Sequence, residues 1–186
     1  MTAWKNDQVS EAETAEIIRL AKEALSLKGD FVELGCYKGD TSLMLADVIS
    51  GSEKKLWIYD SFEGLPAKSE QDFSEVGKDF KEGELYVSKR EVKERFLRAG
   101  MKVPVIKKAW FSDLTEADLP EKIAFAFIDG DFYESIRDSL RLMENKMVVD
   151  GVIIVHDYTN GALPGVAKAV EEWKQSKEFD FKLVLL

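Results

Sequence analysis

The sequence predicts one α/β domain built on a doubly wound, mostly parallel sheet, and three observations support this fold class. Helical and strand patterns alternate along the whole chain, which is typical of a parallel sheet with crossover helices. The length of 186 residues fits one domain of ordinary size. The chain is 45% hydrophobic, which is enough for a sizeable core. We therefore expect a single domain over residues 1–186.

The first half of the chain predicts three helices and two strands. An apolar stripe at helical spacing predicts a helix over residues 10–27, with Gly29 as its C-terminal cap. A strand over 31–34, a helix over 41–49 and a strand over 56–59 follow. Ser88 and Glu91 have the spacing of a capping box and predict a helix that runs to Ala99.

The second half predicts four strands and two helices. Strands are expected over residues 103–107, 123–128, 152–155 and 181–186, and the second of these is a run of apolar residues typical of a buried strand. Helices are expected over 134–146 and 165–176, the latter starting after Pro164. Right-handed crossovers between these strands would give a sheet with a topological switch point.

Residues 63–87 form the least regular part of the sequence. This segment holds several glycines, one proline and many charges. A solvated loop is one interpretation. A lid over a binding site is the other, since long loops in compact domains are often functional.

Charge and composition exclude several classes of function. The formal net charge of −9 argues against binding to nucleic acid or to anionic membrane surfaces. No apolar run approaches the roughly 20 residues that cross a bilayer. Residues 1–10 are polar, unlike a signal peptide, and the single cysteine, Cys36, excludes an intramolecular disulfide. We therefore expect a cytoplasmic protein.

Two turns after the first two strands have features of a nucleotide site. Gly35 and Gly39 follow the first strand and would let the backbone approach a ligand closely. Asp60 follows the second strand, where an acid accepts hydrogen bonds from ribose hydroxyls. Each feature alone also fits an ordinary turn or a solvated acid, but together they predict a cofactor that contains a nucleoside.

Acidic residues and the only histidine follow the next two buried strands. Asp129 and Asp131 come after the strand over 123–128, and His156 and Asp157 come after the strand over 152–155. Like charges that converge are costly unless a cation neutralises them, and oxygen-rich clusters suit Mg²⁺. The alternative is that Asp131 and Asp157 cap the elements that follow them.

Four motifs in this order resemble those of the macrocin O-methyltransferase family. They occupy residues 31–39 (FVELGCYKG), 59–66 (YDSFEGLP), 127–135 (FIDGDFYES) and 151–158 (GVIIVHDY), and the second is the most distinctive. The resemblance spans about residues 11–179. His156 is a departure, because the family commonly has a carboxylate there. The predicted elements also lack the seventh, antiparallel strand that class I methyltransferases normally add.

The resemblance implies a class I methyltransferase that uses S-adenosylmethionine and a divalent metal, with Mg²⁺ as the expected ion. It implies a cofactor site made of Glu33, Gly35, Tyr37, Gly39, Thr41, Ser42, Asp60, Ser61, Trp110 and Asp129. The implied metal ligands are Asp129 and Asp157, and the implied catalytic base is Asp131. From its place after a strand among acids, His156 is a third candidate metal ligand and a second candidate catalytic residue.

These inferences predict an O-methyltransferase that acts on a hydroxyl of a small molecule, first a sugar of a glycoside and second a catechol-like phenol. A nucleotide-dependent oxidoreductase is a rival, although the first turn lacks the three-glycine fingerprint. A catalytically dead binding module is another, although the chain keeps the acids after the fourth and fifth strands. The sequence leaves open the acceptor, the metal and whether the protein forms a homo-oligomer.

Overall fold

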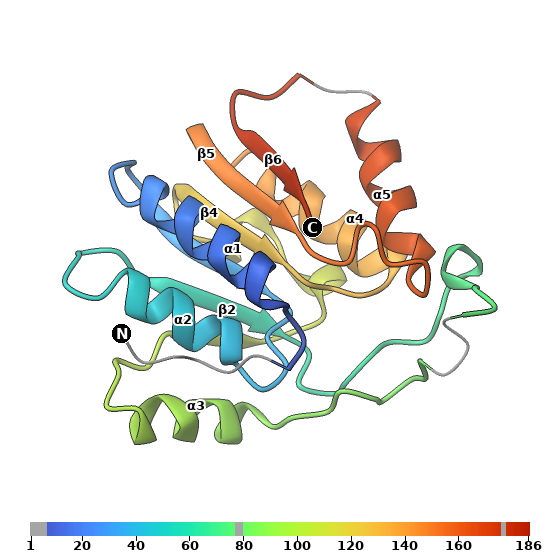
Figure 1. Ribbon diagram of the computed structural model, residues 1–186, viewed down its shortest axis with the longest axis horizontal. Helices are drawn as coiled ribbons and strands as arrows, with labels where there is room; N and C mark the ends of the chain where they lie inside the picture. Colours follow the sequence, from blue (N-terminus) through green and yellow to red (C-terminus); the bar gives the residue numbers. More distant parts are fainter. Residues whose placement is uncertain (1–6, 77–79, 176–177) are drawn as a thin grey trace.

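The computed structural model describes residues 7–76, 80–175 and 178–186 and contains one sheet (Figure 1). The strands are β1 (Asp30–Leu34), β2 (Leu56–Asp60), β3 (Val105–Lys108), β4 (Ile123–Ile128), β5 (Met147–Val155) and β6 (Lys182–Leu185). Their order is β3-β2-β1-β4-β5-β6, and every neighbouring pair is parallel. The order reverses between β1 and β4, which makes this junction the switch point. The predicted doubly wound sheet is confirmed.

Helices cover both faces of the sheet (Figure 1). One face carries α1 (Glu11–Ala24), α2 (Asp40–Val48) and α3 (Lys89–Arg98), and the other carries α4 (Tyr133–Met143) and α5 (Pro164–Lys174). Three short 3₁₀ helices are Glu70–Asp72, Phe111–Asp113 and Glu116–Asp118. Among the described residues the sheet has no antiparallel strand, and β6 lies directly beside β5.

The strands alternate between two apolar layers. Phe31 of β1 and Phe125 of β4 pack toward α1 and α2, and Val32 and Ala126 pack toward α4 and α5. All six residues of β4 are buried. This strand lies in the middle of the sheet, so helices cover it from both sides, which explains its unbroken apolar sequence.

Several predicted boundaries are wrong. The helix expected over 134–146 ends at Met143, and the strand expected from residue 103 begins at Val105. The first helix ends at Ala24, not at residue 27. Gly29 instead lies beside β4 with a φ of +119°, where a Cβ would come within 2.8 Å of the Lys122 carbonyl oxygen. β5 begins at Met147, five residues before the predicted start at 152, because Asp150 and Gly151 interrupt the apolar pattern without ending the strand. Residue 176, the predicted end of the last helix, lies outside the described residues.

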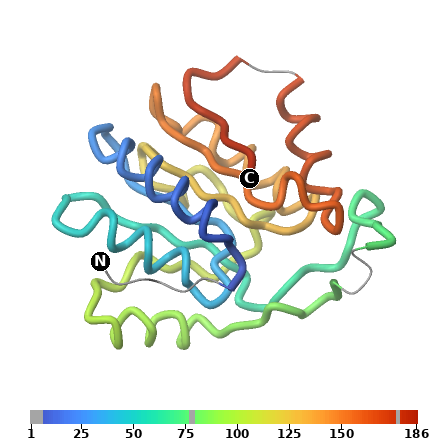
Figure 2. The backbone as a smooth tube through the Cα atoms, viewed as in Figure 1, coloured from blue at the N-terminus to red at the C-terminus, as the bar shows by residue number. Residues whose placement is uncertain are grey.

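The segment over residues 63–87 is closed at its base and anchored to the body, as far as it is described; residues 77–79 lie outside the description. The Leu65 amide donates to the Glu84 carbonyl at 2.8 Å, and the Gly83 amide donates to the Leu65 carbonyl at 2.9 Å. The buried Asp72 accepts from the Tyr133 amide at the start of α4 at 2.7 Å. Figure 2 shows this segment extending away from the sheet and returning to it.

Within the described ranges, every helix is too short or too polar to cross a membrane.

Candidate active site

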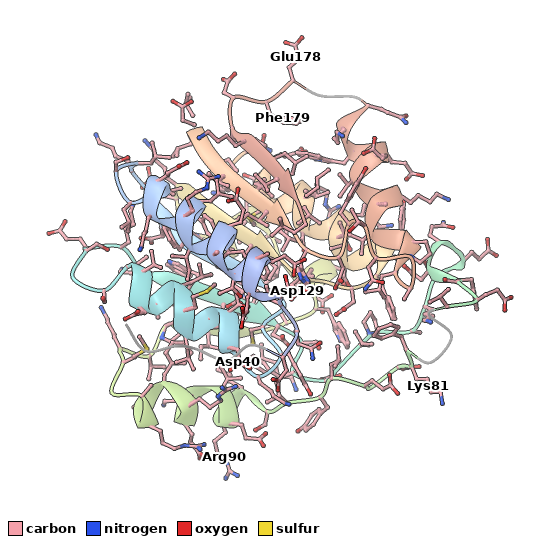
Figure 3. The ribbon with its side chains drawn as sticks, in the orientation of Figure 1. Asp40, Lys81, Arg90, Asp129, Glu178 and Phe179 are labelled. Carbon is pink, nitrogen blue, oxygen red and sulfur yellow. The ribbon has the colours of Figure 1, made fainter. Side chains whose placement is uncertain are left out.

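A cleft opens at the carboxyl ends of the strands, around the switch point. The predicted site residues that line it are Gly35, Tyr37, Asp60, Ser61, Trp110, Asp129, Asp131, His156 and Asp157. Residues from loops complete the wall: Gln8, Gly64, Leu65, Pro66, Leu85, Ala109, Phe111, Gly130 and Ser135. In Figure 3, Asp129 lies at this edge of the sheet, near the first turn of α1.

The turns after β1 and β4 are in direct contact, and a glycine makes this possible. Gly35 has a φ of +85°, and a Cβ there would lie 1.9 Å from the Asp129 carbonyl oxygen. The Asp129 amide in turn donates to the Leu34 carbonyl at 2.9 Å. The absence of a side chain at Gly35 therefore brings the acids after β4 next to the turn after β1. Here the close approach is between two strands of the protein.

Asp60 is held rigidly at the end of β2. Its Oδ2 accepts from the Cys36 amide at 2.8 Å, and its Oδ1 accepts from the Phe62 amide at 2.7 Å. Each carboxylate oxygen can accept a further hydrogen bond. The side chain is thus fixed in orientation at the cleft wall, between Ser61 and the turn after β1, with acceptor capacity left over.

Glu33 lies beneath the cleft and does not line it. Its side chain is fully buried in β1, where Oε2 accepts from the Ser42 hydroxyl of α2 and Oε1 has no hydrogen-bond partner among the described residues. Burial raises the pKa of Glu33 to about 8, against the hydrogen bond from Ser42 and with support from nearby carboxylates. Gly39, Thr41 and Ser42, at the start of α2, also lie outside the cleft lining.

Asp129, His156 and Asp157 form one cluster at the cleft. Nδ1 of His156 lies 3.3 Å from Asp129 Oδ1 and 3.2 Å from Asp157 Oδ2. One ligand atom from each residue can be chosen so that all three lie within 4.8 Å of one another. The histidine side chain is only 6% exposed, whereas the aspartates are about one-fifth exposed, at 23% and 21%. The set is compact enough to surround a cation.

The cluster strongly perturbs its own pKa values. Burial lowers the pKa of His156, but the hydrogen bonds and charges of Asp129 and Asp157 outweigh it and raise the pKa to about 11. Burial raises the pKa of Asp157, but the interactions with His156 and Asn160 outweigh it, so the net pKa is lowered. Asp131 has a raised pKa because it is buried and faces Asp129 and Asp157. Perturbed groups that gather in a cleft are typical of functional sites.

Backbone strain is concentrated at the same cleft. Four residues that line it have positive φ without being glycine: Tyr37 at 43°, Leu85 at 58°, Asp131 at 59° and Asp157 at 60°. Such conformations cost on the order of 1 kcal/mol each and persist where the surrounding structure fixes them. The geometry of the cleft is thus held by the packing around it.

Sequence reasoning missed several residues of the site. Leu65 and Pro66 belong to the motif over residues 59–66, so their position in that motif is a signal for the site. Gln8 enters from the segment before α1, and nothing in its local sequence indicates this. Glu13 also reaches the site: its Oε1 lies 3.8 Å from Nε2 of His156. The Ser10-x-x-Glu13 spacing was a signal for a helix start but not for a contact.

Comparison with known proteins supplies relatives for this chain. The demethyldecarbamoylnovobiocin O-methyltransferase of Streptomyces niveus is 25% identical over 169 residues, which are 87% of this chain and 64% of the relative. A tetracenomycin rhamnosyl 4'-O-methyltransferase of Streptomyces olivaceus is 29% identical over 154 residues, which are 78% of this chain and 58% of the relative. The chain thus spans about three-fifths of the length of these curated relatives.

Solved structures share the fold. The O-methyltransferase NovP superposes with a TM-score of 0.76 at 25% identity, covering 87% of this chain and 70% of that chain. The calicheamicin methyltransferase CalS11 superposes with a TM-score of 0.72 at 17% identity and the same coverage.

The family model for macrocin O-methyltransferase matches residues 13–184, which include β1 to β5 and every predicted site residue. The chain therefore belongs to the macrocin O-methyltransferase family.

Proposed function

We propose that this protein is an S-adenosylmethionine-dependent O-methyltransferase that acts on a hydroxyl of a small natural product, a sugar hydroxyl in the first place. The observation that carries the proposal is that one cleft joins the fixed acid at the end of β2 to the acidic cluster after β4 and β5. One end suits a nucleoside and the other suits a polar acceptor. A relative named for a methylated rhamnosyl group supports the sugar.

The residues present fit the cofactor. Asp60 is preoriented for ribose hydroxyls, and Trp110 offers an aromatic surface beside it for a base. Glu33 lies on β1, which leads into the turn at Gly35 and Tyr37, and its buried Oε1 has no hydrogen-bond partner among the described residues. A buried unsatisfied oxygen is costly, and a ligand amino group or an ordered water would relieve that cost. S-adenosylmethionine, when bound, supplies a methyl group on a positively charged sulfur.

The residues present also fit a divalent cation. Asp129, His156 and Asp157 offer one nitrogen and two carboxylate oxygens, and the carboxylates of Asp129 and Asp157 lie near a third acid, Asp131. A divalent cation, when bound, lowers the pKa of an acceptor hydroxyl. We propose these three side chains as its ligands.

The chain itself positions the acceptor and takes its proton. Asp131 lies in the cleft with a strained backbone that fixes its direction, and we assign it as the base. With S-adenosylmethionine bound, the methyl group would pass to the acceptor oxygen with release of S-adenosylhomocysteine, and Asp131 would take the hydroxyl proton. Leu65, Pro66 and Leu85 exclude water from one wall. Exclusion of water protects the methyl group from hydrolysis.

Calorimetry and a transfer assay test the proposal. S-adenosylhomocysteine should bind, and NAD should not. Labelled S-adenosylmethionine should then be offered with deoxysugar glycosides, catechols and RNA. Label in the glycosides supports the proposal, and label in catechols alone replaces the acceptor class. No binding of S-adenosylhomocysteine, or label in RNA alone, overturns it. EDTA should abolish methyl transfer, and Mg²⁺ or Mn²⁺ should restore it. Full activity in EDTA overturns the proposed metal site.

A further inference from the structure

The first turn of α1 reaches the acidic cluster through one glutamate. Glu13 belongs to the capping box of α1: its Oε2 accepts from the Ser10 amide at 2.8 Å, and its own amide donates to the Ser10 hydroxyl at 3.3 Å. Its other oxygen, Oε1, lies 3.8 Å from Nε2 of His156. The helix cap therefore fixes one oxygen of this carboxylate, and the second oxygen faces the histidine ring.

The ring of His156 has carboxylates on both of its nitrogens. Nδ1 faces Asp129 and Asp157 at 3.3 and 3.2 Å, and Nε2 faces Glu13 at 3.8 Å. The ring also packs against Phe127, with 5.9 Å between ring centroids, and only 6% of the side chain is exposed. The ring is thus fixed in place, and its two nitrogens have different partners.

These positions give the two ring nitrogens different roles, with Nδ1 as a metal ligand and Nε2 as a hydrogen-bond donor. Carboxylates only accept hydrogen bonds, so without a cation Nδ1 carries a hydrogen that faces Asp129 and Asp157. A cation bound among the three residues would replace that hydrogen, and the remaining hydrogen on Nε2 would face Glu13. Adjacent ligand atoms around an ion bound at about 2.1 Å are roughly 3 Å apart. The two Nδ1 to oxygen distances are close to that value. Histidine ligands of metals commonly donate their other N–H to a carboxylate, which sets the tautomer.

We propose that Glu13 is a positioning residue that holds His156 with its hydrogen on Nε2, and that the resulting set of one nitrogen and two oxygens prefers Zn²⁺ or a similar transition ion over Mg²⁺. This inference rests on the metal site of the proposed function. Mg²⁺ is hard and favours oxygen ligands, whereas imidazole suits Zn²⁺ and Fe²⁺. His156 therefore sets the selectivity of the site, and Glu13 acts through it.

The single histidine makes a direct test possible. In protein labelled with ¹⁵N-histidine, the ring nitrogens of His156 are the only such signals of the chain. Addition of Zn²⁺ should shift Nδ1 as a metal ligand and leave the hydrogen on Nε2. Calorimetry with Zn²⁺ and with Mg²⁺ gives the two affinities for each variant, and S-adenosylhomocysteine binding, measured in the same samples, reports whether the fold and the cofactor site are intact.

Three variants separate the roles. His156→Asp should lower the Zn²⁺ to Mg²⁺ affinity ratio at least tenfold. Glu13→Gln, which keeps an acceptor for the capping box, should weaken Zn²⁺ binding about 10-fold or more and disturb the Nε2 hydrogen signal. Glu16→Gln is the matched control, since Glu16 lies on the same helix, pairs with Arg19 and should change neither quantity.

The outcomes distinguish this inference from the proposed function. Unchanged histidine signals on Zn²⁺ addition, or the same Zn²⁺ to Mg²⁺ ratio in wild type and His156→Asp, overturn the ligand assignment. An unchanged Zn²⁺ affinity and tautomer in Glu13→Gln overturn the positioning role. Failure of both ions to bind, with S-adenosylhomocysteine still bound, overturns the metal site and this inference with it, and leaves the proposed cofactor standing. Zn²⁺ bound through Nδ1 without any S-adenosylhomocysteine binding supports this inference and overturns the proposed cofactor.

Discussion

Glu33 should make the stability of the ligand-free protein depend on pH, and the substitution Glu33→Gln should remove this dependence. The carboxyl group is fully buried, accepts one hydrogen bond from Ser42 and leaves Oε1 without a partner among the described residues. Burial raises its pKa from 4.5 to about 8. At neutral pH the folded protein therefore holds a proton on Glu33 that the unfolded chain has released.

The sign and size of the effect follow from linkage. A raised pKa in the folded state means that the contribution of Glu33 to stability is fully present below pH 4.5 and is lost as the pH rises through about 8. Ionisation of Glu33 over the whole range between the two pKa values lowers the free energy of unfolding by about 5 kcal/mol. The part of this loss that falls between pH 6 and pH 9 is about 3 kcal/mol. Glu33→Gln keeps the uncharged shape and cannot ionise. The variant should thus gain about 3 kcal/mol relative to wild type between pH 6 and pH 9.

Urea unfolding and thermal melts of both proteins at pH 6, 7, 8 and 9 measure this gain. For a domain of this size, about 3 kcal/mol corresponds to roughly 6–12 °C in melting temperature. All other titrating groups are shared, so they cancel in the difference between wild type and variant. Glu16→Gln is the control, because Glu16 is exposed, has a lowered pKa and stays ionised throughout. A constant difference between wild type and Glu33→Gln across this pH range would refute the reasoning.

Three further substitutions test the other parts of the site. Asp60→Ala should weaken S-adenosylhomocysteine binding by about 1–3 kcal/mol, because charged hydrogen bonds are lost; unchanged affinity in calorimetry would remove Asp60 from the ribose site. Asp131→Asn should lower the rate of methyl transfer by roughly 10²–10⁴-fold and leave S-adenosylhomocysteine affinity intact, and near-normal turnover would exclude it as the base. Asp72→Ala should destabilise the fold by about 1–3 kcal/mol and speed hydrogen exchange over residues 65–76, since the buried carboxylate caps α4 through the Tyr133 amide. Exchange as slow as in wild type would mean that residues 65–76 are held by other contacts.

The fold was predictable because its signals are local. β4 is buried on both faces, so its apolar run shows in the sequence without knowledge of its neighbours. The order of strands and helices then fixes the sheet through right-handed crossovers. The errors occur where tertiary contacts override local patterns. Gly29 resembles a helix cap, but it is required because β1 approaches the Lys122 carbonyl. Asp150 resembles a turn residue, but it lies within β5 at a φ of 62°.

The candidate site was predictable only where its residues directly follow strands. The carboxyl ends of parallel strands meet at one edge, so Asp60, Asp129 and His156 converge for a reason that the sequence carries. The role of Glu13 has no such reason. A capping box accepts glutamate or glutamine at this position, so the helix alone does not require a charge there. The charge has a consequence only because α1 packs against β4 and β5 and places Oε1 3.8 Å from Nε2 of His156. Glu13→Gln therefore preserves the capping box, which the sequence shows, and removes the charge facing His156, which only the structure shows.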